Sequence, residues 1–266
     1  MLYDAGKVAA ALAGTVLGGR PVVEIPMLQA DDIAFGIECG SDEVLAAWEA
    51  ARAALPVTGR WPLVVWAWEG FSGPDWLPRL AEDRSRLLQM QAELRYATGD
   101  HTLGRSEFVV TVPTVDAALV ERLADLARDG AEPEDDAASA PVGGDHLNWP
   151  DPPGPPAVLL LPVANGWDTL VHFDLHPSGG ALGSVGRLIA VVRSWHERFG
   201  AELVANWGTA LQFAVARPPT TFDEAWPLAL EQVAVAPGTT GLPAVLLRHH
   251  AQALVGRRTW LLHQSP

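Results

Sequence analysis

Cysteine and lysine are almost missing from this sequence of 266 residues, in which Cys39 and Lys7 are the sole residues of their types. One cysteine cannot form an intrachain disulfide, and it cannot supply a thiolate cluster for zinc or for an iron–sulfur centre. Such sparse use of cysteine fits a reducing cytoplasm. A single lysine also removes lysine-based chemistry from consideration.

Long hydrophobic runs are lacking as well. The apolar stretch Val8–Leu17 is far shorter than the roughly 20 residues that span a bilayer. Asp4 before it and Gly18-Gly19-Arg20 after it do not match the charged start and small-residue cleavage site of a signal peptide. We expect a short amphipathic helix here, and a soluble cytoplasmic protein without export or membrane anchoring.

Positive charge is scarce, and the net charge is −14. A protein of this charge repels the phosphate backbone, so nucleic acid is not expected as a partner. The acidity supports solubility, and it would also favour a basic protein partner. The 48% content of hydrophobic residues is what a packed globular core requires.

A segment rich in proline, glycine and acidic residues divides the chain. Residues 129–156 (DGAEPEDDAASAPVGGDHLNWPDPPGPP) contain few large apolar side chains that a core could bury, and many prolines and glycines, which fit poorly into a helix or a sheet. They predict an acidic linker between an N-terminal α/β region, residues 1–128, and a C-terminal domain, residues 157–266.

Helix and strand patterns alternate in the N-terminal region. Apolar repeats and capping residues predict helices at 4–17, from Ser41 to about Pro56, at 77–96 and at 116–128. Short apolar runs predict strands at 22–28, 62–68 and 108–112.

The C-terminal region follows a regular order of elements. Predicted strands lie at 158–163, 170–175, 202–205, 211–216 and 259–263, and predicted helices at 185–199, from Thr220 or Thr221 to about 233, and at 242–255. The order is a βαββαβ-like module. The fold class is α/β, with α+β as the alternative, and helices pack on a mixed sheet.

Three segments of the C-terminal region occur in the same order and spacing in a known family. They are Arg193–Val204 (RSWHERFGAELV), Arg217-Pro218-Pro219, and Glu224–Gln232, followed by the aromatic final strand around Trp260. This region resembles domain of unknown function family 4253. Upstream, Gly59–Leu63 (GRWPL) is similar to a Gly-x-Trp-Pro-Leu segment of such proteins. The resemblance implies a fold and, because the family is uncharacterised, no activity.

The chain departs from the family pattern at polar positions. Phe173–Pro177 stands where family members tend to have Trp-Asn-Glu-Cys-Pro, and their Tyr-Cys-x-Asp is absent around residues 233–238. Leu262-His263-Gln264 replaces a closing Trp-Trp-Asp. Any activity that those groups support in the family is therefore in doubt here.

The sharpest candidate for chemistry is His172-x-Asp174-x-His176. On a strand, residues two apart point to the same side, so two imidazoles and a carboxylate would share one face. Such a trio could hold a divalent metal with an open position for water, as a hydrolytic site requires. The alternative is the wet face of a half-buried strand with two ordinary surface histidines.

A second candidate is a set of polar residues in the C-terminal region: Arg217, Glu231 and Gln232. Arg217 could bind a carboxylate through both of its terminal nitrogens. Glu231 and Gln232 would need a partner within hydrogen-bond reach to act in catalysis, and structural contacts are the alternative.

Tryptophan is frequent, with 11 in the chain, and several lie close together around Trp66, Trp68 and Trp76. Exposed rings would make anchors for a protein partner, whereas buried rings would serve the core.

Two functions follow from these patterns. The first is a non-catalytic protein-binding protein of an interaction or immunity type, which uses an acidic surface and exposed tryptophans and needs no cofactor. The second is a metal-dependent, hydrolase-like enzyme built on His172, Asp174 and His176, with a divalent metal as cofactor. The missing catalytic motifs favour the first.

Overall fold

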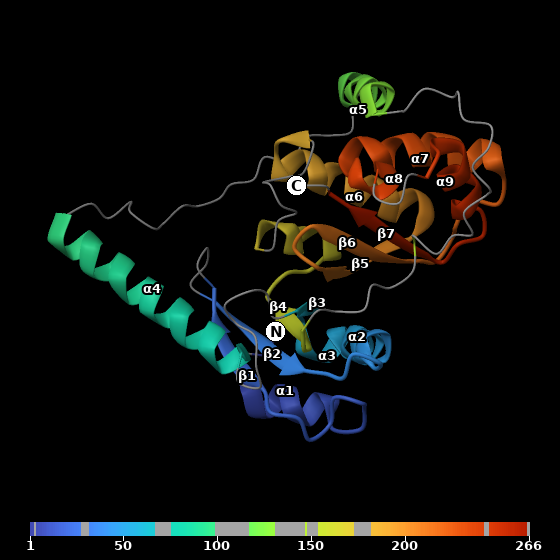
Figure 1. Cartoon of the computed structure of the whole chain (residues 1–266). Helices are drawn as coiled ribbons and strands as arrows, with labels where there is room; N and C mark the ends of the chain where they lie inside the picture. Colours follow the sequence, from blue (N-terminus) through green and yellow to red (C-terminus); the bar gives the residue numbers. More distant parts are fainter. Residues whose placement is uncertain are drawn as a thin grey trace. The chain divides into compact units, whose positions relative to one another are not determined.

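A computed structural model describes residues 1–2, 4–27, 32–66, 76–98, 117–130, 147, 154–172, 182–241 and 245–264 (Figure 1). The chain divides into two units, and each is described by itself. Unit 1 comprises Met1–Val109 and Asp151–His172, and unit 2 comprises Val110–Pro150 and Phe173–Pro266.

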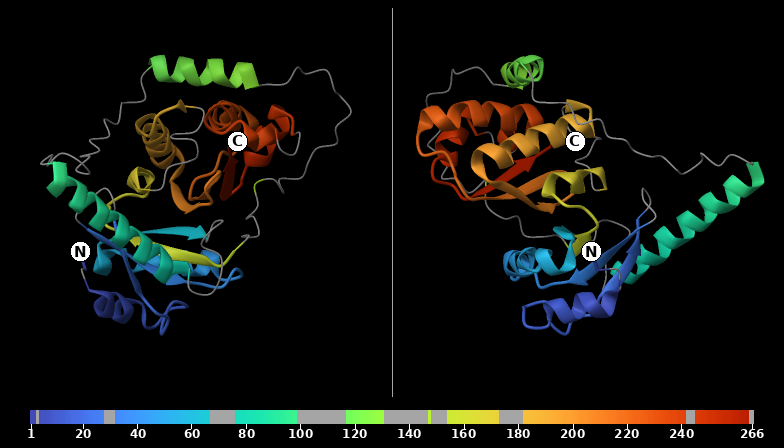
Figure 2. Two further views of the ribbon diagram at one scale, coloured as in Figure 1. Left: turned by 60° about the vertical axis from the view of Figure 1, so that its left-hand side comes forward. Right: turned by 180° about the vertical axis from the view of Figure 1, so that it is seen from behind.

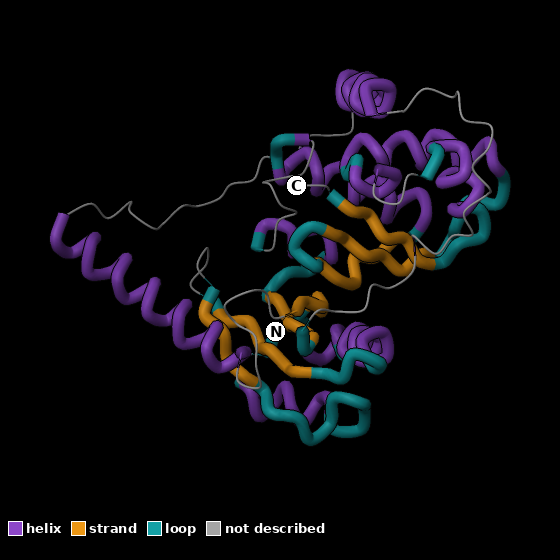
Figure 3. Tube along the Cα trace, in the orientation of Figure 1, coloured by secondary structure: helices purple, strands orange, loops and turns teal. Residues whose placement is uncertain are grey.

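Unit 1 is built on four strands in the order β1-β2-β4-β3, each antiparallel to its neighbours. Their bounds are Val23–Pro26 (β1), Ile33–Glu38 (β2), Trp61–Trp66 (β3) and Pro156–Leu161 (β4). Figure 3 shows these strands as orange tubes around the N-terminus. The fourth strand in the sequence thus lies between the second and the third.

Strand β4 has two neighbours and no polar residue. Val158 lies opposite Ile37 of β2 and Val64 of β3. Residues 157–161 are 0% exposed. A continuous apolar run is the pattern expected of a strand that is covered on both faces, and β4 is the centre of the unit 1 core.

The helices of unit 1 are α1 (Ala5–Leu12), α2 (Val44–Ala53), α3 (Leu55–Thr58), α4 (Trp76–Thr98) and the 3-10 helix η2 (Gly166–Val171). Two of their ends have a clear local cause. The Asp4 carboxylate caps α1 by accepting from the backbone N–H of Lys7 at 2.9 Å. Gly59 ends α3 in the left-handed conformation, at φ 67°.

Helix α4 packs on β1 and β2 through its first turns (Figure 2). Leu77 lies over Gly36, where a Cβ atom would come within 2.7 Å of the leucine side chain and 2.8 Å of Ile25. The glycine in β2 therefore allows the helix to approach the sheet closely.

Unit 2 contains a three-stranded antiparallel meander in the order β5-β6-β7. The strands are Ala201–Asn206 (β5), Ala210–Val215 (β6) and Thr259–His263 (β7), and the helices are α5 (Ala117–Gly130), α6 (Val185–Phe199), α7 (Phe222–Val235), α8 (Gly238–Gly241) and α9 (Leu247–Leu254). Figures 1 and 2 show α6, α7, α8 and α9 on the same side of these strands.

Aromatic rings fill the space between this sheet and its helices. The Trp195 ring of α6 lies edge-on to Phe213 of β6 and Trp260 of β7, with centroid distances of 5.8 and 6.2 Å. All three side chains are 0% exposed. Edge-to-face rings of this kind add to the free energy of burial, so the large aromatic residues of unit 2 form its core.

Much of the predicted fold is confirmed. The α/β class with helices packed on a sheet is confirmed, and so is the βαββαβ-like order, which β4, α6, β5, β6, α7 and β7 provide. Helix α6 has the predicted bounds, Gly200 ends it at φ 60°, and Thr221 caps α7 by accepting from the N–H of Glu224 at 3.2 Å.

Five element predictions need correction. The predicted helix 4–17 is shorter, Ala5–Leu12. Residues 166–171 form the 3-10 helix η2, so a strand beginning at Leu170 is wrong. Ser41 does not cap α2, which begins at Val44 after Glu43. The predicted helix 242–255 is shorter, Leu247–Leu254. Strand β2 was absent from the prediction. The predicted strand 108–112 lies outside the described residues.

The predicted division into two domains and a linker stays a prediction, because most of residues 129–156 lie outside the described part of the chain. Strand β4 nevertheless joins residues on both sides of that division, since it pairs with β2 and β3. Among the helices that the structure describes, none is long and apolar enough to cross a membrane.

Candidate functional site

The structure places one member of the predicted metal trio. His172 follows η2 in the right-handed helical conformation, with φ −97° and ψ −30°, rather than in a strand. Asp174 and His176 lie outside the described residues. Within the described ranges, no group of three or more histidine, cysteine, aspartate or glutamate side chains could hold a metal ion. The metal trio stays a prediction, without strand geometry at His172.

The predicted polar set does not converge on one site. Arg217 donates to the backbone oxygens of Glu197 at 2.9 Å and His196 at 3.4 Å, at the C-terminal end of α6. A guanidinium at this position satisfies carbonyl groups that the helix leaves without partners and suits the negative end of its dipole. The contacts of Arg217 therefore stabilise the end of α6.

Glu231 and Gln232 of α7 form hydrogen bonds with neighbouring helices. The Glu231 carboxylate accepts from Trp195 Nε1 at 2.7 Å and from Arg198 at 2.8 Å, which joins α7 to α6. Gln232 is 0% exposed, and its Oε1 accepts from His250 Nε2 of α9 at 3.0 Å. These side chains make structural contacts between helices.

The predicted tryptophan anchors differ in exposure. Trp76 is 2% exposed, so its ring belongs to the core and offers no binding surface. Trp66 is half-buried at the end of β3, and Trp68 lies outside the described residues. Of the three, Trp66 alone is described with part of its surface accessible.

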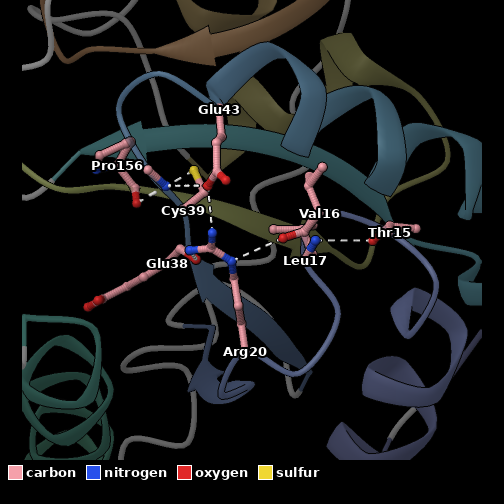
Figure 4. A network of polar contacts seen from close by, with 9 residues as sticks. Thr15, Val16, Leu17, Arg20, Glu38, Cys39, Glu43 and Pro156 are labelled. Carbon is pink, nitrogen blue, oxygen red and sulfur yellow. Dashed lines mark hydrogen bonds and ion pairs between the residues drawn. The ribbon is translucent and has the colours of Figure 1, made fainter.

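The cysteine is held in a network of polar contacts at the end of β2 (Figure 4). Its thiol lies 3.7 Å from the backbone oxygen of Pro156, and nearby Arg20 pairs with the Glu43 carboxylate. Burial raises the pKa of Cys39 to about 11, and the positive charge of Arg20 offsets this only in part. Because the thiolate is the nucleophilic form, Cys39 is not suited to thiol catalysis.

A different group of charged side chains meets at one end of the unit 1 sheet. The antiparallel register brings the end of β1, the starts of β2 and β3, and the end of β4 to the same edge: Pro26 lies opposite Ile33, and Trp61 lies opposite Leu161. We call five residues at this edge the charged cluster: Asp32, Arg60, Arg84, Asp168 and His172.

Arg60 is the most deeply buried member of the charged cluster. Its guanidinium, 0% exposed, donates to the backbone oxygens of Leu2 at 2.7 Å and of Ile33, and pairs with Asp32 at 3.3 Å. It also lies 4.7 Å from the centroid of the Phe35 ring. A buried cation is stable when its N–H groups are matched in this way, so Arg60 fixes the geometry of the edge.

Arg84 reaches the cluster from α4. It continues the face of α4 on which Leu77 and Leu80 are buried, at spacings of three and then four residues. Its Nη1 lies 4.0 Å from Met27 Sδ, and the backbone N–H of Met27 donates to the backbone oxygen of Asp32 at 3.0 Å. Burial lowers the pKa of Arg84, although a guanidinium stays charged at neutral pH.

His172 enters from the end of η2, and its surroundings disfavour the charged imidazole. Burial lowers its pKa most, the charge of Arg84 lowers it further, and Asp32 and Asp168 act in the opposite direction. The imidazole is therefore neutral at pH 7. Its Nδ1 is buried and has no hydrogen-bond partner in the described part of the chain.

The remaining acidic groups of the cluster already accept hydrogen bonds. The Asp32 carboxylate accepts from the N–H of Ile33 at 2.7 Å in addition to Arg60, and Asp168 accepts from Asn165 at 2.8 Å. Partly buried titratable groups that converge from distant parts of a chain mark candidate functional sites.

Comparison with known proteins finds a family similarity for part of the chain. Residues 157–263 match the model of DUF4253, a domain of unknown function, and we refer to this matched region as the DUF4253 domain. No curated protein and no solved structure matches the chain. The predicted C-terminal resemblance is thus confirmed, while the weaker N-terminal resemblance stays a prediction.

The DUF4253 domain contributes to both units. It begins within β4 and continues through η2, which belong to unit 1, and it ends with β7 of unit 2. Asp168 and His172 lie inside the DUF4253 domain, whereas Asp32, Arg60 and Arg84 precede it. The charged cluster is therefore assembled from the family domain and the sequence before it.

Sequence patterns had singled out His172 and missed the other four members. The signal for Asp32 and Arg60 was present, since each immediately precedes a strand. The sequence alone does not show that these two residues lie close together. The strand order shows it, because the starts of β2 and β3 lie on either side of the end of β4.

Proposed function

We propose that this protein is a non-catalytic binding protein that engages a basic protein partner through residues 1–156. The observation that carries the proposal is the uneven distribution of charge. The DUF4253 domain contains seven acidic and seven basic residues, whereas residues 1–156 contain 25 acidic and 11 basic residues. The net charge of −14 thus resides entirely outside the family domain.

The described surface of unit 1 supports this proposal. Acidic side chains are exposed on several of its elements: Asp4, Glu24, Asp42, Glu49 and Glu82. Complementary charge steers a basic partner and sets specificity and association rate more than affinity. We propose the cytoplasm as the place of action, because a single buried cysteine suits a reducing compartment.

Three side chains with groups of the kind used in catalysis are buried or bound to neighbouring helices. Burial keeps the Cys39 thiol protonated, and Glu231 and Gln232 bind neighbouring helices. These contacts favour binding over the hydrolase-like alternative.

Affinity capture with the full chain tests the proposal. At about 50 mM NaCl we expect a stoichiometric partner with net positive charge, and at about 500 mM NaCl we expect its loss, because salt screens exposed charges. A variant with Asp42→Asn, Glu49→Gln and Glu82→Gln should capture less of it.

The matched control carries Glu197→Gln and Asp223→Asn, two exposed acidic residues of the DUF4253 domain, and should capture the partner as the wild type does. Failure to recover any basic partner at low salt would contradict the proposal, as would capture that neither salt nor the unit 1 variant changes.

A further inference from the structure

We propose that one face of α2 and α3 is the part of unit 1 that binds the partner, and that it binds an amphipathic helix with lysine or arginine beside its apolar side chains. This inference deepens the proposed function and rests on it. The residues of this face, which we call the outward face, are Asp42, Leu45, Ala46, Glu49, Ala53 and Val57. All six side chains are exposed.

Helical spacing places these residues on one side of the chain. Leu45, Glu49 and Ala53 follow one another at intervals of four residues in α2, and residues with this spacing share a helix face. Ala54, the one residue between α2 and α3, keeps the right-handed helical conformation, with φ −79° and ψ −6°. Val57 of α3 therefore extends the same exposed face.

The opposite side of α2 is fixed in the core of unit 1. Its buried residues are Val44, Ala47, Trp48 and Ala51, and the helix packs on β3 and β4. Trp48 Nε1 also donates to the backbone oxygen of Pro62 at 3.1 Å. The outward face is thus held in place before any partner arrives, which lowers the entropic cost of binding.

The apolar part of the outward face suits a helix as its partner. Leu45 is 36% exposed and Val57 is 64% exposed. Ala46 and Ala53 lie between them and add only one methyl group each, so a second helix can approach closely and place its side chains beside Leu45. An amphipathic helix recognises such a face through apolar residues at the same spacing.

The charge of the outward face determines what must flank those apolar residues. Asp42 precedes Leu45 by three residues, and Glu49 follows it by four. Arg52 is the one basic residue in the sequence of α2 and α3; its side chain is half-buried, and its guanidinium lies 4.3 Å from the centroid of the Trp61 ring. Negative charge beside apolar groups is complemented by lysine or arginine beside apolar groups.

Binding of a designed peptide to the full chain tests the inference. The probe is a fluorescent helical peptide of alanine, leucine and lysine, with leucines along one face and lysines on both sides of them, and anisotropy at about 50 mM NaCl gives its Kd. We expect binding to the wild type. Leu45→Ser with Val57→Ser should raise the Kd by about 5-fold or more, because a few apolar contacts carry much of the affinity. Asp42→Asn with Glu49→Gln should raise it by about 2–5-fold.

The matched control is Val120→Ser with Glu121→Gln, two exposed residues of α5 in unit 2, which should bind the peptide as the wild type does. A second peptide, with serine in place of every leucine, keeps the charge and should bind at least about 5-fold more weakly.

Three results would overturn the inference: no binding of the first peptide to the wild type, equal affinity of the Leu45 and Val57 variant and the α5 control, or equal affinity of the two peptides. None of them bears on whether affinity capture recovers a basic partner in a salt-dependent way, so the proposed function and this inference can fail separately.

Discussion

Two half-buried histidines, one in each unit, have a lowered pKa. His172 lies at the end of η2, and His263 ends β7, where its Nε2 is 3.4 Å from Thr209 Oγ1. Burial is the main cause at His172 and the cause at His263. In the unfolded chain both imidazoles regain the ordinary pKa of 6.5.

These shifts predict that acid destabilises the protein. Because the folded pKa is lowered, the stabilisation is fully present above pH 6.5 and is lost as the pH falls from 6.5 toward the folded values. Urea unfolding at about pH 7.5 and about pH 5.5 measures the difference. The free energy of unfolding should be lower at the acidic pH.

The double variant His172→Gln and His263→Gln should lose less stability between these two conditions. Hydrogen bonds from Thr220 lower the pKa of Glu224, but that carboxylate titrates below its ordinary 4.5 and leaves the tested window unaffected. Equal pH dependence in wild type and double variant would refute the assignment.

At the scale of elements, α6 is bracketed by two glycines in the left-handed conformation. Gly183 lies just before the helix at φ 62°, and Gly200 ends it at φ 60°. A Cβ atom on Gly200 would lie 2.9 Å from the Ala216 Cβ, whereas one on Gly183 would have no heavy atom within 4 Å. The pair separates backbone strain from steric overlap.

Gly183→Ala should cost about 1 kcal/mol through the positive φ alone, and Gly200→Ala should cost about 1–3 kcal/mol more because of the close contact. Chemical denaturation followed by circular dichroism gives both values. Equal costs for the two substitutions would show that Ala216 yields without penalty.

How far the sequence predicts an element depends on whether its pattern is local. Helix α6 was predicted to the residue, because its apolar repeat and its terminal glycine are both visible in the sequence. Strand β2 was missed, since Gly36 interrupts a short apolar run. A glycine is needed at this position because the Leu77 and Ile25 side chains pack directly against it. Those contacts are made by distant parts of the chain and leave no local pattern in the sequence.

In the segment after β4 the sequence predicts a strand that does not form, whereas β2 is a strand that the sequence did not predict. Alternating apolar residues from Leu170 to Leu175 predict a strand, but residues 166–171 form the 3-10 helix η2. Local hydrogen bonds favour the turn: Thr169 Oγ1 donates to the Gly166 oxygen at 2.6 Å, and Asn165 donates to Asp168. Gly166 also packs on the Trp61 ring, where a Cβ atom would come within 2.8 Å.

The charged cluster could not be predicted by the same means. Its members are spread from residue 32 to residue 172 and meet because β4 separates β2 from β3. That strand order depends on long-range pairing, which the spacing of residues along the chain does not contain. His172 was identified for a different reason, the two-residue spacing of a strand that does not form at its position.

At the scale of the whole molecule, the DUF4253 domain is not expected to fold correctly by itself. A fragment of residues 157–266 would carry most of β4 without β2 and β3, which cover both of its edges in the full chain. Unpaired apolar strands expose hydrogen-bonding groups and associate with other chains.

We therefore expect this fragment to aggregate, or to lose amide protection in residues 157–161, while the full chain remains soluble with those amides among the slowest to exchange. Solubility and hydrogen exchange measured side by side give the comparison. A soluble fragment with full protection of β4 would contradict the expectation.

The position of β4 also bears on how such a protein can change during evolution. A recombination event that moved only residues 157–263 into another gene would break the chain inside a strand, between Pro156 and Ala157. The transferred segment would fold only in a host protein that supplies one pairing strand at each edge of β4. Inheritance of this domain is thus tied to the sequence that precedes it, and lineages that keep one are expected to keep the other.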